Sequence, residues 1–154
     1  MSPRPAPVSE LNSHVGFWLR YVSNHVSLAF ARKVESRGVT VAEWVFMRHL
    51  FEVEALAPSR LAERMGMTRG AISKLAERLL AKALVKRVED KSDGRAHTLS
   101  LTPAGGALVP KLAALADAND AEFFDHLSPK ERAGLLRVLK EIVEKRGLAR
   151  VPID

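Results

Sequence analysis

The residues best equipped for polar recognition form a short run between Thr68 and Arg78. Basic and small polar residue types recur there at helical spacing, at Thr68, Arg69, Gly70, Ser73, Lys74 and Arg78. Arg and Lys reach guanine edges or phosphates, Ser bonds to either, and Gly lets the backbone come close. The first turn of a helix also directs its backbone N–H groups at a nearby phosphate. The chemistry open to this run is noncovalent contact with a groove of nucleic acid.

A helical hairpin must position these side chains. The first helix opens at Pro58, because a missing N–H costs little in a first turn, and it ends at Gly66, which suits a left-handed terminus. Its apolar face is Leu61, Ala62 and Met65. Thr68 is a good N-cap for the second helix, whose predicted buried stripe is Ile72, Leu75, Ala76 and Leu79. An ordinary helical hairpin with a solvated basic face is the alternative, because such hairpins are common.

A charged hairpin is predicted after the second helix. Residues 84–89 and 97–101 have the composition of two short strands. Asp93 and Gly94 supply the turn between them, and Arg95 lies at or near the tip, where it can enter a narrow minor groove. In a second interpretation, Asp93 and Arg95 form only a surface ion pair, worth about 0–1 kcal/mol.

The stretch from Ser59 to Thr102 resembles the MarR family of bacterial winged-helix regulators. The matching parts are the runs 59–68 and 79–87, then Asp90, Asp93, Arg95 and Leu99-Ser100-Leu101-Thr102. The Asp and Arg two apart, shortly before Leu-x-Leu-Thr, are the most specific signature. The resemblance extends from about Leu11 to Leu148. It implies a homodimer whose recognition helices enter major grooves and whose wings reach minor grooves.

Two positions depart from the family pattern. The family usually has Gly where this chain has Ala83, and often Arg where it has Lys91. Ala at a left-handed helix end is strained by about 1 kcal/mol, so we expect the second helix to end differently here. The resemblance and the positions together assign these roles: groove readers Arg69, Ser73 and Lys74; phosphate contacts Arg78, Lys91 and the N-cap Thr68; wing tip Arg95, oriented by Asp93.

The excess positive charge is concentrated in the same stretch. The chain carries a net charge of +6, and residues 58–101 contain ten basic and five acidic side chains. A merely solubilising surface would not predict this concentration, whereas a nucleic acid footprint would. With 154 residues, 47% hydrophobic and 27% charged, the composition is that of one globular domain. The absence of cysteine excludes disulfides, Cys-based zinc sites and thiol redox sensing.

Long helices flank the recognition stretch. The first is predicted from Ser9 to Ser36, with an apolar face wider than one neighbour would cover. The helix after Thr102 should bend at Pro110, and Gly105-Gly106 weakens its first turn by about 1 kcal/mol per Gly. Capping boxes, at Thr40–Glu43 and Ser128–Glu131, open the helix before the hairpin and the last helix.

The predicted fold is mainly α with a small β-hairpin wing. We divide it into a flexible arm (1–8), a helical dimerisation region (9–38 and 103–148), a winged helix-turn-helix (39–102) and a tail (149–154). The N-terminus lacks a signal-peptide core, and no run reaches transmembrane length. We therefore expect a cytoplasmic protein without a membrane partner.

Catalytic and metal-binding motifs are missing from the sequence. There is no His-x-x-x-His pair, no His-Glu-x-x-His and no glycine-rich phosphate loop, so we predict no enzyme, no metal and no cofactor. Family members often bind aromatic or phenolic compounds between the helical frame and the winged domain, which implies a small effector here. The candidate ligand residues are Trp18, Tyr21, Trp44, Met47, Arg48 and His49, although aromatic residues at helical spacing are more often core.

These observations predict a sequence-specific, double-stranded DNA-binding transcriptional regulator. It should be a ligand-responsive repressor that acts as a homodimer on a pseudo-palindromic operator, with half-sites about one helical turn apart. Two alternatives stay open: a sequence-tolerant architectural DNA-binding protein, and a helical module that binds a protein partner. Binding to specific and scrambled DNA separates the three.

Overall fold

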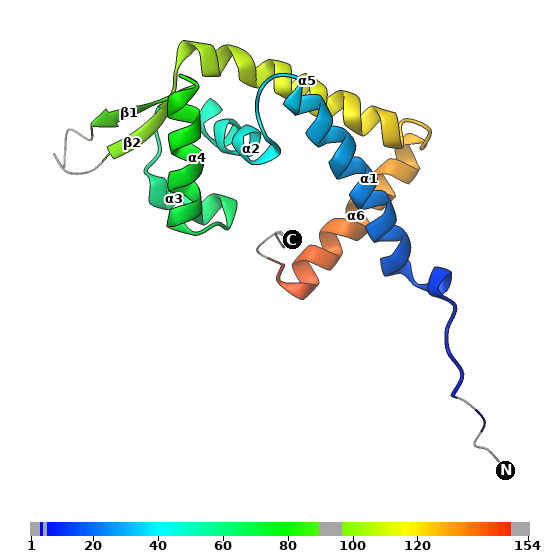
Figure 1. Cartoon of the computed structure of the whole chain (residues 1–154). Helices are drawn as coiled ribbons and strands as arrows, with labels where there is room; N and C mark the ends of the chain where they lie inside the picture. Colours follow the sequence, from blue (N-terminus) through cyan, green and yellow to red (C-terminus); the bar gives the residue numbers. More distant parts are fainter. Residues whose placement is uncertain (1–3, 5, 90–96, 149–154) are drawn as a thin grey trace.

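The computed structural model describes residues 4, 6–89 and 97–148 (Figure 1). Its elements, in chain order, are η1 (Leu11–Ser13), α1 (Val15–Glu35), α2 (Val41–Phe51), α3 (Pro58–Met65), α4 (Arg69–Ala81), β1 (Val85–Glu89), β2 (His97–Leu101), α5 (Pro103–Phe124) and α6 (Pro129–Arg146). The prediction of a mainly α fold with a small β-hairpin is confirmed.

The first helix begins later than the sequence predicted. The chain forms a single 3-10 turn, η1, and then an extended residue, His14, before α1 opens at Val15. No side chain of η1 is buried, and the Trp18 indole donates to the Asn12 carbonyl at 2.7 Å. A short turn with nothing to pack against gains too little to extend a helix, so the prediction of a helix from Ser9 was wrong at its start.

The hydrophobic core lies between α2, α3, α4 and the hairpin, and the C-terminal end of α1 and the first half of α5 close it. Its fully buried side chains are Val34, Phe46, Met47, Leu50, Leu61, Ile72, Leu79, Val109 and Leu112. The predicted stripe of α4 is buried at all four positions, Ile72, Leu75, Ala76 and Leu79. Burial of this stripe fixes which face of α4 points outward.

The wing is a two-stranded antiparallel hairpin. β1 pairs with β2 from Val85 opposite Leu101 to Glu89 opposite His97. An isolated bridge from Leu56 to Leu99 ties the segment before α3 to β2. The first strand begins one residue after the predicted Leu84. The predicted turn and the tip residues, Lys91, Asp93, Gly94 and Arg95, lie outside the described residues.

Helix α4 ends in a left-handed residue although no glycine is present. Ala83 has φ of 56°, and the N–H groups of Ala83 and Leu84 donate to the carbonyls of Leu80 and Leu79, both at 3.0 Å. This pair of bonds is the Schellman arrangement. The expectation that α4 would end differently from its relatives was therefore wrong, because the carbonyls at the end of the helix gain more from these bonds than the alanine loses.

We expect Ala83→Gly to stabilise the protein by about 0.5–1 kcal/mol. A left-handed conformation costs an L residue about 1–2 kcal/mol, and the greater freedom of unfolded glycine offsets about 0.5–1 kcal/mol of that gain. Ala83 is exposed, so the substitution removes no packing. Urea unfolding at fixed protein concentration measures the difference. A lower midpoint for Ala83→Gly would show that the residue is not strained.

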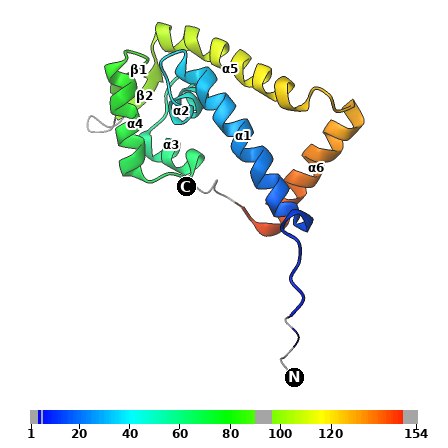
Figure 2. The same cartoon turned by 45° about the vertical axis from the view of Figure 1, so that its right-hand side comes forward.

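Helices α1, α5 and α6 form an elongated frame (Figure 2). α1 and α5 meet near α2 and diverge, and α6 returns from the far end of α5 towards the N-terminal end of α1. The predicted capping box at Ser128 and Glu131 is confirmed. Pro110 lies inside one continuous helix; the bend predicted there stays a prediction. None of the described helices is both long and apolar enough to cross a membrane.

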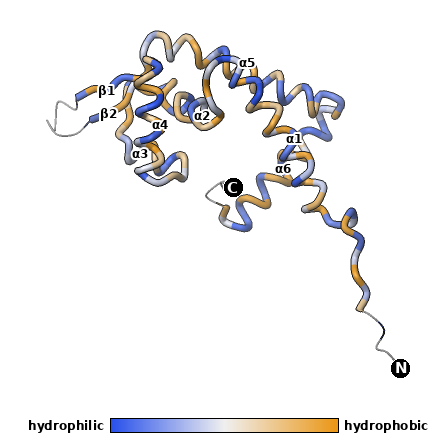
Figure 3. Tube along the Cα trace, viewed as in Figure 1, coloured by the Kyte–Doolittle hydropathy of each residue, from blue (hydrophilic) through white to orange (hydrophobic). Residues whose placement is uncertain are grey.

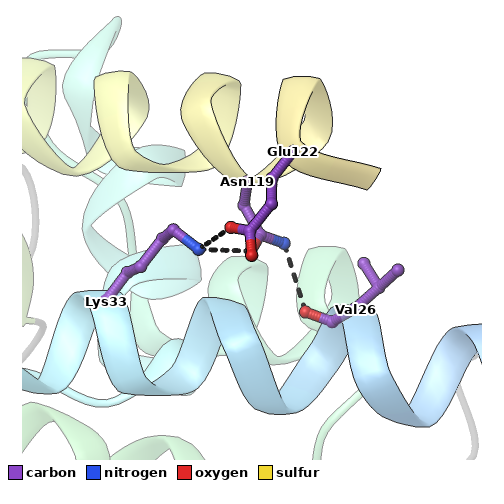
Figure 4. Close-up of polar contacts among 4 residues, drawn as sticks. All are labelled: Val26, Lys33, Asn119 and Glu122. Carbon is purple, nitrogen blue, oxygen red and sulfur yellow. Dashed lines mark hydrogen bonds and ion pairs between the residues drawn. The ribbon is translucent and has the colours of Figure 1, made fainter. Parts of the chain in front are cut away.

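A polar cluster joins α1 to α5 (Figure 4). The amide of Asn119, which is 4% exposed, donates to the Val26 carbonyl at 3.1 Å. The Lys33 ammonium donates to the Asn119 side-chain oxygen at 3.0 Å and also pairs with Glu122. Because a buried amide left without partners would cost about 1–3 kcal/mol, these contacts hold the two helices in one register.

Candidate nucleic-acid interface

The turn between α3 and α4 has the geometry that its sequence predicts. Gly66 is left-handed, with φ of 63°, so it reverses the chain at the end of α3. Thr68 then caps α4, and its side-chain oxygen accepts from the Ala71 N–H at 3.1 Å. A capped helix start leaves the other N–H groups of the first turn available to an anion.

The outward face of α4 carries the predicted recognition residues. Thr68, Arg69, Gly70, Ser73, Lys74, Glu77 and Arg78 are all exposed, whereas the opposite face is packed in the core. The structure thus brings all six described DNA-contact candidates together on one element, which lies beside the hairpin (Figure 1). This arrangement is a convex, basic ridge of the width that a major groove accepts.

The cations of this ridge are available for contact. Among the described residues, no ion pair involves Arg69, Lys74 or Arg78; on α3, Arg60 instead pairs with Glu63 at 3.2 Å. A cation without a protein carboxylate loses no internal pair when it binds a phosphate. Binding of a phosphate by these three side chains would therefore break no salt bridge among the described residues.

The described part of the wing adds two basic residues that the sequence analysis did not select. Lys86 and Arg87 are exposed on β1, where they lie opposite Ser100 and Leu99. Their neighbouring positions on one strand place them on opposite faces of the hairpin. The sequence does show Lys86 and Arg87 as a basic pair within a predicted strand. Membership of a strand alone does not tell which face of the hairpin is exposed to solvent.

Comparison with known proteins agrees with this geometry. The sequence model of the MarR family matches residues 37–96. A candidate regulatory protein for the hcr operon of Thauera aromatica is 29% identical over 129 residues, 83% of this chain and 78% of that protein. The transcriptional repressor MdtR of Bacillus subtilis is 28% identical over 122 residues, 79% of each chain.

Solved structures match nearly the whole chain. A candidate transcriptional regulator from Pseudomonas aeruginosa gives a TM-score of 0.75 at 28% identity, over 86% of this chain and 99% of that one. These similarities support a winged helix-turn-helix regulator of the MarR type, with the family's sequence pattern in residues 37–96. The fold is also that of an E. coli MarR mutant in complex with operator DNA (TM-score 0.76, 20% identity, 88% and 99% covered). CouR from Rhodococcus jostii, bound to p-coumaroyl-CoA, has the same fold. The match has a TM-score of 0.75 at 24% identity and covers 88% of this chain and 95% of that one.

The comparisons support a DNA-binding transcriptional regulator of the MarR type. The family match spans the turn after α1, then α2, the helix-turn-helix and β1. It therefore covers every element that carries the ridge. Among the described residues, no three His, Asp or Glu side chains converge as a metal site would require.

The six candidate ligand residues fall into two groups. Trp18 and Tyr21 are about half exposed on the N-terminal half of α1. The other four, Trp44, Met47, Arg48 and His49, belong to α2. Met47 has no exposed surface, and Arg48 pairs with Glu52 at 3.2 Å. An apolar groove of about 600 Å³ between α1, the end of α5 and α6 is lined by Trp18 but by none of the α2 candidates.

His49 links the stability of this protein to pH. Burial lowers the pKa of His49, and the positive charges of Arg64 and Arg48 lower it further. An unfolded histidine has a pKa near 6.5, so protonation favours the unfolded chain. The contribution of neutral His49 to the free energy of unfolding is complete above about pH 6.5. It is lost as the pH falls through the lower pKa of His49 in the folded protein.

We therefore expect the wild-type protein to lose more unfolding free energy between pH 7 and pH 5 than His49→Gln does. The neutral amide has no proton to take up in that interval. Urea unfolding of both proteins at the two pH values measures the difference. Equal losses for the two proteins would show that His49 titrates alike in the folded and unfolded states.

Proposed function

We propose that this protein is a ligand-responsive repressor that binds a pseudo-palindromic operator as a homodimer. The observation that carries the proposal is the exposed basic face of α4, which starts at a capped turn and lies beside a basic hairpin. In the proposed complex, α4 enters the major groove. There Arg69, Ser73 and Lys74 meet base edges, and Thr68 and Arg78 meet phosphates. Arg95 of the wing enters the minor groove, with Asp93 orienting it and Lys91 on the backbone.

Unpartnered apolar surface on the frame supports the homodimer. Although α6 is 18 residues long, none of its side chains is buried within its own chain. On α6, Ile142 is 47% and Val143 48% exposed; on α1, Leu19 is 49% exposed. Figure 3 shows hydrophobic positions recurring along α1 and α6 between hydrophilic ones. Apolar faces of this extent are stable in water only when another surface covers them, and a second copy supplies the same faces.

We expect Ile142→Asp to dissociate the dimer. A carboxylate at a covered apolar position would be desolvated without a partner. Sedimentation equilibrium measures the change, with Glu141→Ala as the control, since Glu141 is the neighbouring residue and pairs with Arg137 on the same helix. If Ile142→Asp sediments as wild-type protein does, the proposed use of α6 is wrong.

The effector is proposed to be a small aromatic or phenolic compound. The support is a fold relative that binds such a group, the p-coumaroyl-CoA of CouR, together with the aromatic candidates on α1 and α2. Trp44 and His49 are half-buried and can be reached from solvent, whereas Met47 can contact a ligand only after α2 repacks. An effector must bind the DNA-incompetent dimer more tightly in order to release DNA.

Fluorescence anisotropy tests the whole proposal. The protein is titrated against its own upstream intergenic DNA and a scrambled fragment at two salt concentrations, then against a panel of aromatic acids. The expected preference for the native fragment is ~10³ or more, with a steep salt dependence. Equal binding to both fragments would favour the architectural alternative. No binding to either, or no release by any acid, would count against the operator or the effector respectively.

A further inference from the structure

The C-terminal end of α4 is the place where the recognition helix is attached to the frame. The Lys82 ammonium donates to the Gly38 carbonyl at 2.8 Å and to the Glu43 carboxylate at 2.7 Å. Gly38 ends the turn after α1, and Glu43 lies in the first turn of α2. The side chain of Lys82, the C-cap residue of α4, therefore reaches both the turn after α1 and the start of α2.

The Glu43 carboxylate depends on this contact. Glu43 is only 1% exposed, and Lys82 is its cationic partner at 2.7 Å. Removing one partner of a buried ion pair leaves an uncompensated charge, whereas replacing both by apolar residues of similar volume is often close to neutral. The Lys82–Glu43 pair is thus a specific, directional contact between the end of α4 and the start of α2.

A second set of contacts holds the next two residues against α5. The Thr102 hydroxyl donates to the Ala83 carbonyl at 2.7 Å, and the Thr102 N–H donates to the Leu84 carbonyl at 3.1 Å. Gly105, in the first turn of α5, lies so close that a Cβ there would be 2.1 Å from the Leu84 oxygen. Residues 82–84 are therefore held by α1, α2 and α5 together. The Asn119 cluster keeps α1 and α5 in register, so both attachments belong to the same frame.

The other end of α4 projects away from this attachment with an exposed basic face. Helix α4 has 13 residues, which at 1.5 Å per residue make it about 20 Å long. A rotation of roughly 10° about its C-terminal end therefore moves Arg69 by about 3.5 Å. That displacement is about one base-pair step of 3.4 Å.

We propose that Lys82, acting through Glu43 and Gly38, is a positioning residue that sets the half-site spacing the dimer accepts. It fixes the angle between α4 and the frame, and in a symmetric dimer that angle acts twice, once in each subunit. The proposal rests on the proposed function, because spacing has a meaning only for a dimer on two half-sites. In this proposal the Lys82–Glu43 pair contributes to the choice of operator spacing and not to stability, because a protein with apolar residues of similar size in both positions would be about as stable.

The experiment measures affinity for operators whose half-sites are moved apart or together by one and two base pairs. For wild-type protein we expect a single optimum and a loss of about tenfold or more at one base pair either side. For Glu43→Met/Lys82→Met we expect the ratio between the optimum and its neighbours to fall to about threefold or less, or the optimum to move. The control is Arg137→Met/Glu141→Met, which removes an exposed ion pair from α6.

The spacing ratio separates positioning from folding. A loss of active protein lowers every affinity by the same factor and leaves the ratio unchanged. A spacing profile of Glu43→Met/Lys82→Met identical to that of wild type would overturn the inference while leaving the dimeric regulator intact. Wild-type protein without any spacing optimum would instead overturn the proposed function. If the double variant does not fold, Lys82→Arg, which keeps the charge but changes the reach, replaces it and is expected to move the optimum.

Discussion

Operator affinity is expected to fall by about a thousandfold in Arg69→Ala/Lys74→Ala. Each side chain that reads a base edge contributes about 1–3 kcal/mol, and the double variant removes four of them from the proposed dimer. Even at about 1 kcal/mol each, the sum is about 4 kcal/mol, which corresponds to a factor of ~10³. Stability should change little, because both side chains are exposed and neither belongs to an ion pair among the described residues. Fluorescence anisotropy and thermal unfolding measure the two effects.

The control for this variant is Lys111→Ala/Lys140→Ala. It removes the same number of positive charges from exposed positions on α5 and α6, away from the ridge. We expect it to lose only the small share of affinity that long-range attraction supplies, a share that shrinks further as salt is added. An equal loss from both variants would show that total charge, and not the α4 ridge, drives binding.

Gly105→Ala should destabilise the protein by about 3 kcal/mol. The added Cβ would lie 2.1 Å from the Leu84 carbonyl oxygen and 3.2 Å from the Leu101 side chain. The first of these atoms is backbone, so the start of α5 has to move away from the end of α4. Overpacking of this kind costs typically about 1–3 kcal/mol, occasionally more, and the displacement also strains the Thr102 contacts with Ala83 and Leu84.

The neighbouring glycine is the matched control. At Gly106 an added Cβ meets nothing within 4 Å, so Gly106→Ala should stabilise the helix by about 0.5–1 kcal/mol. Urea unfolding of both variants at one protein concentration gives the comparison, since the stability of a dimer depends on concentration. Effects of the same sign at the two positions would mean that helix propensity, rather than the contact with Leu84, decides the outcome.

Local chemistry is sufficient to predict the recognition unit. The left-handed turn at Gly66 and the N-cap at Thr68 follow from residues adjacent in sequence. The buried stripe of α4 follows from its spacing, and burial of that stripe leaves the basic residues outside. Such features depend on one helical repeat and its ends, so the surrounding fold changes them little.

Tertiary contacts determine several features that the spacing of residues in the sequence does not predict. Gly105 and Gly106 look equivalent in the sequence, and only the approach of Leu84 distinguishes them. The residues of the Lys82–Glu43 pair are 39 positions apart, and no periodicity predicts that a surface lysine will neutralise a buried carboxylate. The candidate ligand residues on α1 and α2 are likewise separated in the structure. Trp18 lines the groove between α1, α5 and α6, and none of the candidates on α2 lines it.

The recognition surface can therefore be derived from the sequence alone: its turn, its cap, its basic face and its resemblance to the MarR family. Long-range packing sets how that surface is attached, through residues 82–84, to the end of α1 and to the starts of α2 and α5. The two kinds of feature differ in how far apart along the chain the interacting residues lie. Helix ends and faces are set by neighbours within one or two turns, whereas the angle between two helices is set by contacts between residues distant in the chain.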